Sequence, residues 1–255
     1  MSQELLLGER QDLIRTRLDL SGRVIAAALA QELGVSEDTI RRDLREMAAS
    51  GLCRRVYGGA LRITQSQTSM KERMAIGGAR KAALAQTAAG LIPAGSTVFL
   101  DSGSTNLALA RALPAGSDLT VATNAPAIAA ILLERDIATI QLGGLIDPGV
   151  GGAIGAKAMR DAEALCPDIL VLGVCGIDPD AGITAYTFED AEFKRYVASR
   201  SKLVLVTFTN DKLSIAAPYS VVPLSRVARA VVEVDADETD VAALAATGIE
   251  ILRAG

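Results

Sequence analysis

The sequence predicts an α/β fold in two parts, a small and mostly helical domain followed by a Rossmann-like domain with a mainly parallel sheet. From Arg80 onward, helical segments alternate with short apolar runs that lack polar alternation, which is typical of parallel strands covered on both faces. The chain has 255 residues, of which 50% are hydrophobic, so it can build two domains with sizeable cores.

Changes in this pattern give the expected domain boundaries. Residues 1–62 indicate three helices and a hairpin, residues 63–79 a polar linker that ends in Gly-Gly, and residues 80–255 the α/β domain. In the α/β domain we expect strands within 96–100, 119–123, 138–142, 168–174, 202–208, 230–234 and 249–252, and helices within 81–92, 106–113 and 125–134.

Residues 26–44, AAALAQELGVSEDTIRRDL, predict an apolar helix, a tight turn and a second helix. Gly34 suits the left-handed residue that ends a helix, and Ser36 is a good N-cap for the helix that follows. Two helices joined by such a turn form a helix-turn-helix, whose second helix normally enters the major groove of DNA. At this point an ordinary surface helix with a solvated face remains an equal alternative.

The second helix of this unit has two distinct faces. At 100° per residue its basic residues share one arc with Asp38, and its large apolar residues lie opposite. The basic face holds Arg41, Arg42 and Arg45, and the apolar face holds Ile40, Leu44 and Met47.

A basic hairpin follows this helix. Gly58-Gly59 stands between two short apolar runs, which is the signal for a two-residue hairpin. A basic hairpin after a recognition helix is the wing of a winged helix-turn-helix, and it touches the phosphate backbone. The candidate DNA-binding residues are Ser36, Thr39, Arg41, Arg42, Arg45, Arg54, Arg55, Tyr57 and Arg62.

The charge distribution favours DNA as the partner. Residues 39–80 carry a net charge of +6, residues 81–255 carry −7, and the whole chain carries −4. Of the 26 basic residues 20 are arginine, which suits bidentate contacts with phosphate and guanine. The basic stretch disfavours the alternative that the helical domain is a protein-interaction module, and its modest size predicts a homodimer or homotetramer.

Composition excludes several classes of site. The chain has no histidine and three cysteines, so Ser-His-Asp catalysis, Cys-His catalysis, a Cys/His zinc site and a disulfide framework are not expected. Neither GxGxxG nor GxxxxGK[ST] occurs. We expect no catalytic residue, metal or cofactor, and, because no signal peptide or membrane span is visible, a cytoplasmic protein with no membrane partner.

The ends of the predicted strands carry small and polar residues, where open α/β sheets bind ligands. The first strand runs into Asp101-Ser102-Gly103-Ser104-Thr105, and a helix follows from Asn106. Hydroxyl groups at a helix N-terminus suit a phosphate, although they could also simply cap the helix. Thr123-Asn124, Gly143-Gly144 and Gly176–Asp178 stand at later strand ends, and together they favour a small-molecule site.

Two lysines stand out in a domain that has few. Lys194 follows an acidic cluster and Lys212 follows a strand, so each could bind an anionic ligand or pair with a neighbouring acid. A sugar-phosphate isomerase is the alternative function, in which Asp178, Glu189 and Lys194 could serve as acid/base groups.

The sequence resembles the DeoR family of bacterial transcriptional regulators over residues 5–235. SEDTIRRDL at 36–44 is similar to the family's recognition helix, and RRVYGGA at 54–60 to its wing. LDSGSTN, TNAP, LGG, GVCGID, GIT, EDAEFKR and NDKL follow in the family's order.

The resemblance implies a sensor domain similar to ribose-5-phosphate isomerase, in a repressor of a carbohydrate operon that leaves its operator when a phosphorylated sugar binds. It places the phosphate at residues 102–105, and Asp101, Asp178, Lys194 and Lys212 beside the sugar. Residues 208–212, FTNDK, depart from the commoner Ala-Asp-Ser-Ser-Lys, which alters the hydroxyl groups beside the effector. The candidate effector-binding residues are Asp101, Ser102, Gly103, Ser104, Thr105, Thr123, Asn124, Gly144, Gly176, Asp178, Glu189, Lys194 and Lys212.

Overall fold

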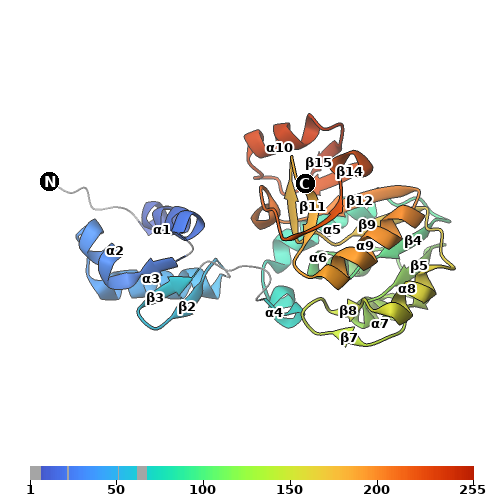
Figure 1. The fold of residues 1–255 in the computed structure, drawn as a ribbon, viewed down its shortest axis with the longest axis horizontal. Helices are drawn as coiled ribbons and strands as arrows, with labels where there is room; N and C mark the ends of the chain where they lie inside the picture. Colours follow the sequence, from blue (N-terminus) through green and yellow to red (C-terminus); the bar gives the residue numbers. More distant parts are fainter. Residues whose placement is uncertain (1–6, 22, 51, 62–67) are drawn as a thin grey trace. The chain divides into compact units, whose positions relative to one another are not determined.

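The computed structural model describes residues 7–21, 23–50, 52–61 and 68–255. Its chain divides into two compact units, residues 1–68 and residues 69–255, each with its own core (Figure 1).

The first unit is a winged helix-turn-helix, as the sequence predicts. Gly34 ends α2 with φ of 65°, and Ser36 caps α3 by accepting a hydrogen bond from the Thr39 amide. An antiparallel sheet of strand order β1-β3-β2 completes the unit; β1 was not among the expected elements. The elements are α1 (Leu7–Ser21), β1 (Arg23–Ile25), α2 (Ala26–Leu33), α3 (Glu37–Ala49), β2 (Arg54–Val56) and β3 (Gly59–Leu61).

The apolar face of α3 forms the centre of the first core. Ile40, Leu44 and Met47 are each at most 1% exposed, and they pack with Ile14 and Leu18 of α1. The helical period therefore predicted correctly which face of α3 is buried.

The second unit is built on a parallel sheet of the strand order β15-β14-β12-β9-β4-β5-β6. These seven described strands coincide with the predicted apolar runs. They are β4 (Thr97–Leu100), β5 (Thr120–Thr123), β6 (Ala138–Gln141), β9 (Ile169–Leu172), β12 (Leu203–Thr207), β14 (Arg229–Val232) and β15 (Glu250–Arg253).

Helices cover both faces of this sheet (Figure 1). Alternate residues of one strand enter different cores: Val98 and Leu100 pack on the side of α5, α6 and α7, whereas Phe99 packs on the side of α8 and α9. The helices are α5 (Gly78–Ala89), α6 (Ser104–Ala112), α7 (Pro126–Glu134), α8 (Ala156–Ala162), α9 (Phe188–Arg200) and α10 (Glu238–Ala245).

Two small antiparallel pieces were not expected from the sequence. One is a sheet of order β10-β11-β13, and the other is the hairpin β7–β8. Their strands are only two to four residues long, too short for an alternating pattern to reveal them. They are β7 (Ile146–Asp147), β8 (Gly152–Ala153), β10 (Gly176–Asp178), β11 (Gly182–Ala185) and β13 (Tyr219–Val222).

The structure differs from the linker expected over residues 63–79. The division between the units falls at Thr68 and Ser69, and α4 (Met70–Ala75) already belongs to the second unit. A capping box starts this helix: the Ser69 hydroxyl accepts from the Glu72 amide at 3.3 Å, and a Glu72 carboxylate oxygen accepts from the Ser69 amide at 2.7 Å. Residues 62–67 lie outside the described part of the chain.

Candidate nucleic-acid interface and anion site

Two arginines of α3 present free charge to solvent. Arg42 and Arg45 are exposed, and neither forms an ion pair within the described part of the chain. Arg41 is also exposed, but its guanidinium donates to Glu37 of the same helix at 2.7 Å. Arg42 and Arg45 are therefore the side chains of this face that are ready to bind phosphate or guanine.

The start of α3 is a closed hydrogen-bonded turn. The Ser36 hydroxyl accepts from the Thr39 amide at 3.1 Å and lies 2.8 Å from the Thr39 hydroxyl. These two predicted DNA-binding residues therefore serve the N-cap, where both are near the surface of the helix end.

The wing is a hairpin whose loop is one residue earlier than expected. Val56 pairs with Gly59, so Tyr57 and Gly58 form the loop, with φ of +83° at Gly58. Gly59 lies in β3, where a Cβ atom would come 2.0 Å from the carbonyl oxygen of Val24. Tyr57 and Arg55 are exposed; the side chain of Arg54 and the whole of Arg62 lie outside what the structure describes.

A buried ion pair joins α1 to α3 beneath this surface. The Arg10 guanidinium donates from Nε to Asp43 Oδ2 and from Nη2 to Asp43 Oδ1, the latter at 3.1 Å. Asp43 is 1% exposed, so its charge is compensated inside the unit and does not oppose the basic face.

In the second unit, the residues after β4 leave the N-terminus of α6 open. Gly103 is the N-cap residue, and no side chain caps the helix, so the alternative of hydroxyl groups that merely cap α6 is wrong. The hydroxyls of Ser104 and Thr105 are partly exposed and make no hydrogen bond to described residues. Free amides and hydroxyls at the positive end of a helix can bind an anion.

Asp101 organises the base of this site. Its Oδ1 accepts from the Ser102 amide at 2.8 Å, and its Oδ2 accepts from the Gly173 amide at 2.9 Å. A Cβ at position 173 would come 2.5 Å from the Ser102 carbonyl oxygen, so glycine permits this approach of β9 to β4. The Asn124 side chain accepts a second bond from the Ser102 amide at 3.0 Å.

Lys194 of α9 brings its ammonium group close to Asp101. Its Nζ donates to Asp190 Oδ2 at 2.7 Å and lies 3.8 Å from Asp101 Oδ2. Burial alone would lower the pKa of Lys194, but the two carboxylates outweigh it and hold the pKa above its usual value. Burial raises the pKa of Asp101 to about 6, although Lys194 opposes the shift.

The structure thus brings together Asp101, Ser102, Asn124 and Lys194, with residues 103–105 directly beside them in the chain. The other predicted residues have local roles. The Thr123 hydroxyl accepts from the Ala125 amide, and the Asp178 carboxylate caps the turn after β10. Gly176 packs against the Ile215 carbonyl, and Gly144 has φ of 131°. Glu189 is exposed, and Lys212 pairs with Asp211.

Four further residues, in this site or on the elements around it, were missed. Asp190 stands four residues before Lys194, so the helical i,i+4 spacing could have predicted their pair. Asn106 donates to the carbonyls of Asp101 and Val171, at 2.9 and 3.0 Å, and thereby ties β4 to β9. Arg73 and Lys81 come from the expected linker and from the start of α5, and no sequence pattern connects them to the site.

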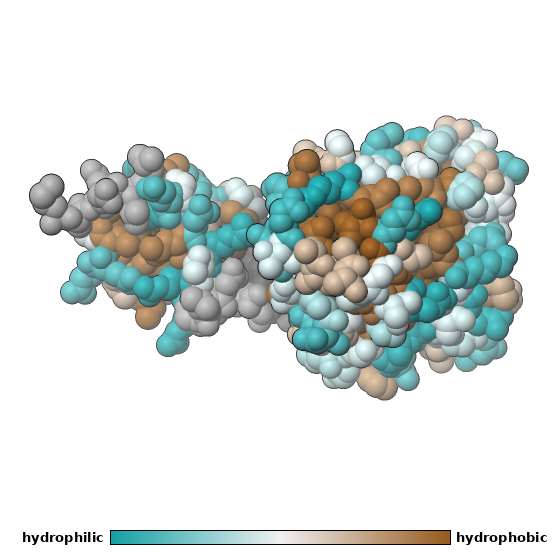
Figure 2. Space-filling view, turned by 90° about the horizontal axis from the view of Figure 1, so that it is seen from above, coloured by the Kyte–Doolittle hydropathy of each residue, from teal (hydrophilic) through white to brown (hydrophobic). Residues whose placement is uncertain are grey.

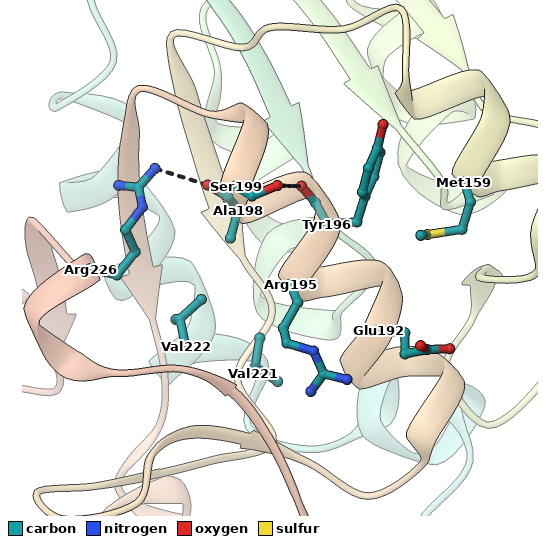
Figure 3. A pocket seen from close by; sticks show the side chains of 9 residues that line it. All are labelled: Met159, Glu192, Arg195, Tyr196, Ala198, Ser199, Val221, Val222 and Arg226. Carbon is teal, nitrogen blue, oxygen red and sulfur yellow. Dashed lines mark hydrogen bonds between the residues drawn. The ribbon is translucent and has the colours of Figure 1, made fainter.

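A separate groove of about 530 Å³ lies along α9 and β13, and no predicted site residue lines it (Figure 3). Two of its polar side chains bond to backbone carbonyls: Arg226 donates to the Ala198 carbonyl at 2.9 Å, and the Ser199 hydroxyl to the Tyr196 carbonyl at 2.7 Å. Apolar residues also gather on the second unit in the view of Figure 2.

Among the described residues, no group of acidic or sulfur side chains could hold a metal ion. None of the described helices combines the length and the apolar character needed to cross a membrane.

Comparisons with known proteins agree with this architecture. The DeoR-like helix-turn-helix domain matches residues 10–66, and the DeoR C-terminal sensor domain matches residues 78–234. The chain belongs to the DeoR family of transcriptional regulators. This DeoR-family chain is 33% identical to the glycerol-3-phosphate regulon repressor of Escherichia coli K12 over 193 residues, which cover 75% of this chain and 77% of the relative.

Two other matches are more distant. The transcriptional regulator GolR of Listeria innocua is 30% identical over 219 residues, covering 84% of this chain and 85% of the relative. Ribose 5-phosphate isomerase A of Neisseria gonorrhoeae superposes with a TM-score of 0.40 at 14% identity, covering 56% of this chain and 55% of that one.

Proposed function

We propose that this DeoR-family protein is a cytoplasmic repressor of a carbohydrate operon and acts as a homodimer or homotetramer. A phosphorylated sugar releases it from its operator DNA. The observation that carries the proposal is the open N-terminus of α6, where the amides and hydroxyls of residues 103–105 stand free beside Asp101 and Lys194. The name of the glycerol-3-phosphate regulon repressor, which is 33% identical, supports the same class of effector.

The DNA-binding half of the proposal rests on Arg42 and Arg45. Operator sites are selected from genomic DNA, and affinity is measured by fluorescence anisotropy at two salt concentrations. We expect Arg42→Ala and Arg45→Ala each to cost about 1–3 kcal/mol of operator binding. Arg15→Ala is the matched control, since Arg15 is exposed on α1 of the same unit. Unchanged affinity in both α3 variants would contradict the recognition-helix assignment.

The effector half is tested by a thermal-shift screen of phosphorylated sugars, because a ligand that binds only the native state raises the melting temperature. Ser104→Asp places a carboxylate at the N-terminus of α6 and should abolish the shift. Ser199→Asp introduces the same charge at an exposed position of α9 and should leave it. An effector that binds without weakening operator affinity would exclude the release mechanism.

The same geometry speaks against an active isomerase. The predicted acid/base groups do not form one catalytic arrangement: the Asp178 carboxylate accepts from the Asp180 and Ala181 amides, and Glu189 is exposed. Lys194 is held in its protonated form by Asp190 and Asp101 and cannot act as a base. We therefore expect no turnover of pentose phosphates in a coupled assay.

A further inference from the structure

Helix α4 occupies a special place in the chain. It is the first element of the second unit, and only residues 62–69 separate it from strand β3 of the wing. Release of α4 would therefore detach the residues of the second unit that follow the wing most directly in the chain.

One side chain of α5 binds the C-terminal end of α4. The Lys81 ammonium donates to the carbonyl oxygens of Arg73 and Ile76, the latter at 2.7 Å. These carbonyls belong to the end of α4, where a helix has no partners of its own for them. Arg73 adds a bond to the Val150 carbonyl at 3.2 Å, and Met70 packs over Gly151.

Lys81 lies at the same edge of the sheet as the anion site. Helix α5 leads into the parallel strand β4 and packs beside α6, so its first turn stands near the carboxyl ends of the strands. Electrostatic interactions connect Lys81 with Lys212 and Asp211, and connect Arg73 with Cys175 and Asp190. Helix α4 also contacts α6, whose N-terminus is open.

The charge of Lys81 is poorly compensated. The residue is 9% exposed, and among the described residues no carboxylate lies within ion-pair distance of its ammonium. Burial and the neighbouring Lys212 lower its pKa to about 8. Two neutral carbonyls are weaker partners for a buried cation than an anion would be.

We propose that Lys81 is an effector-sensing residue: it holds the last carbonyls of α4 in the free protein and moves to an anionic group of the effector when that group enters the site, which releases α4. This inference rests on the proposed function for the nature of the ligand. Because one ammonium serves two competing partners, effector binding and the docking of α4 oppose each other.

The hold is tested first without ligand, by hydrogen exchange on the full-length protein. Lys81→Met should make the amides of residues 70–77 exchange about tenfold faster or more, since it removes charge-assisted bonds. Lys71→Met is the matched control, because Lys71 is exposed on α4 itself. The comparison requires wild-type protection in β4 and β9; if Lys81→Met loses it, Lys81→Gln replaces that variant. Unchanged exchange in residues 70–77 with an intact sheet would overturn the proposal.

The competition is tested next with glycerol 3-phosphate, ribose 5-phosphate and inorganic phosphate. Binding should slow exchange in residues 102–106 and accelerate it in residues 70–77 of the wild type, and Lys81→Met should bind about tenfold more weakly with no further change in residues 70–77. Slower exchange in residues 102–106 without acceleration in residues 70–77 would overturn the release of α4 but leave the effector site intact. No protection of residues 102–106 by any phosphate compound would instead refute the proposed function and the competition that rests on it. The ligand-free experiment would still show whether Lys81 stabilises the docking of α4.

Discussion

Each unit buries a cluster of charges, and the two clusters are built differently. In the first unit, Arg10 and Asp43 form a balanced pair in which two guanidinium nitrogens bond both carboxylate oxygens. In the second unit, one ammonium on Lys194 serves two carboxylates, and Asp190 Oδ1 is buried with no hydrogen-bond partner among the described residues.

This difference distinguishes an ion pair with a structural role from the charge cluster of a ligand-binding site. A balanced, bidentate pair satisfies both of its members and fixes α1 against α3. A cluster with surplus charge and an unsatisfied oxygen leaves part of its charge uncompensated and shifts the pKa values of its members, as is common in binding sites. Arg73 of α4 also interacts electrostatically with Asp190 of this cluster.

The largest effect is expected at Lys194. Lys194→Met leaves Asp101 and Asp190 buried together without a cation, which should cost about 3–5 kcal/mol or more of stability in the second unit. Hydrogen exchange at increasing urea concentration, followed in β9, measures this cost. Lys202→Met is the control, since that exposed lysine pairs with Asp168 at the surface and should cost less than about 1 kcal/mol. A small loss for Lys194→Met would mean that the carboxylates are not ionised together.

Breaking the balanced pair should have a slightly smaller effect, confined to the first unit. Arg10→Met leaves one buried carboxylate, and we expect a loss of about 3 kcal/mol, followed by hydrogen exchange in α3. The double variant Arg10→Met with Asp43→Leu should recover most of the loss, because an apolar pair needs no charge compensation. If the double variant remained as unstable as Arg10→Met, packing of the Arg10 stem and not charge would explain the effect.

The pH dependence of stability should reveal the titration of Asp101 in the second unit. The pKa of Asp101 is raised from 3.8 to about 6, so the folded state keeps this proton at a pH where the unfolded chain has lost it. Stability is therefore lost as pH rises through about 4 to about 6, by an amount on the order of 2–3 kcal/mol. Comparing the urea midpoints of wild type and Asp101→Asn across this range measures the contribution. Parallel curves for the two proteins would show that Asp101 does not titrate there.

Sequence periodicity predicted the parts of the molecule that depend on local pattern. The buried face of α3, the cap at Ser36 and the seven parallel strands all follow from the spacing of neighbouring residues. The start of α4 also had a local signal, the Ser69-to-Glu72 capping box, which the polar character of the segment concealed.

Most contacts in the charge clusters join distant segments and have no local pattern; the pair of Asp190 with Lys194, at i,i+4 spacing, is the exception. Arg10 and Asp43 are 33 positions apart, and Gly173 approaches Asp101 only because β9 lies beside β4. The sequence placed Asp101 and Lys194 in one site through the family resemblance, but it did not indicate that Asp190 shares the ammonium. Lys81 is a further example, because its partners are backbone carbonyl groups at the end of α4, and the residue types of the sequence do not indicate such partners.

The smallest effect is expected when the same substitution, Asp→Asn, is made in both clusters. This pair of variants is also the most direct test of the difference between the balanced pair and the surplus charge. Asp43→Asn removes the carboxylate that bonds the Arg10 guanidinium and should cost about 2 kcal/mol in the first unit. Asp190→Asn removes the surplus charge, while the amide oxygen can still accept from Lys194 and Asp101 still balances the ammonium. Its effect on the second unit should therefore stay within about 1 kcal/mol of zero. Hydrogen exchange in α3 and in β9 gives both values under one condition. Equal losses in the two variants would show that the second cluster is as balanced as the first, with a cation such as Arg73 supplying the missing charge.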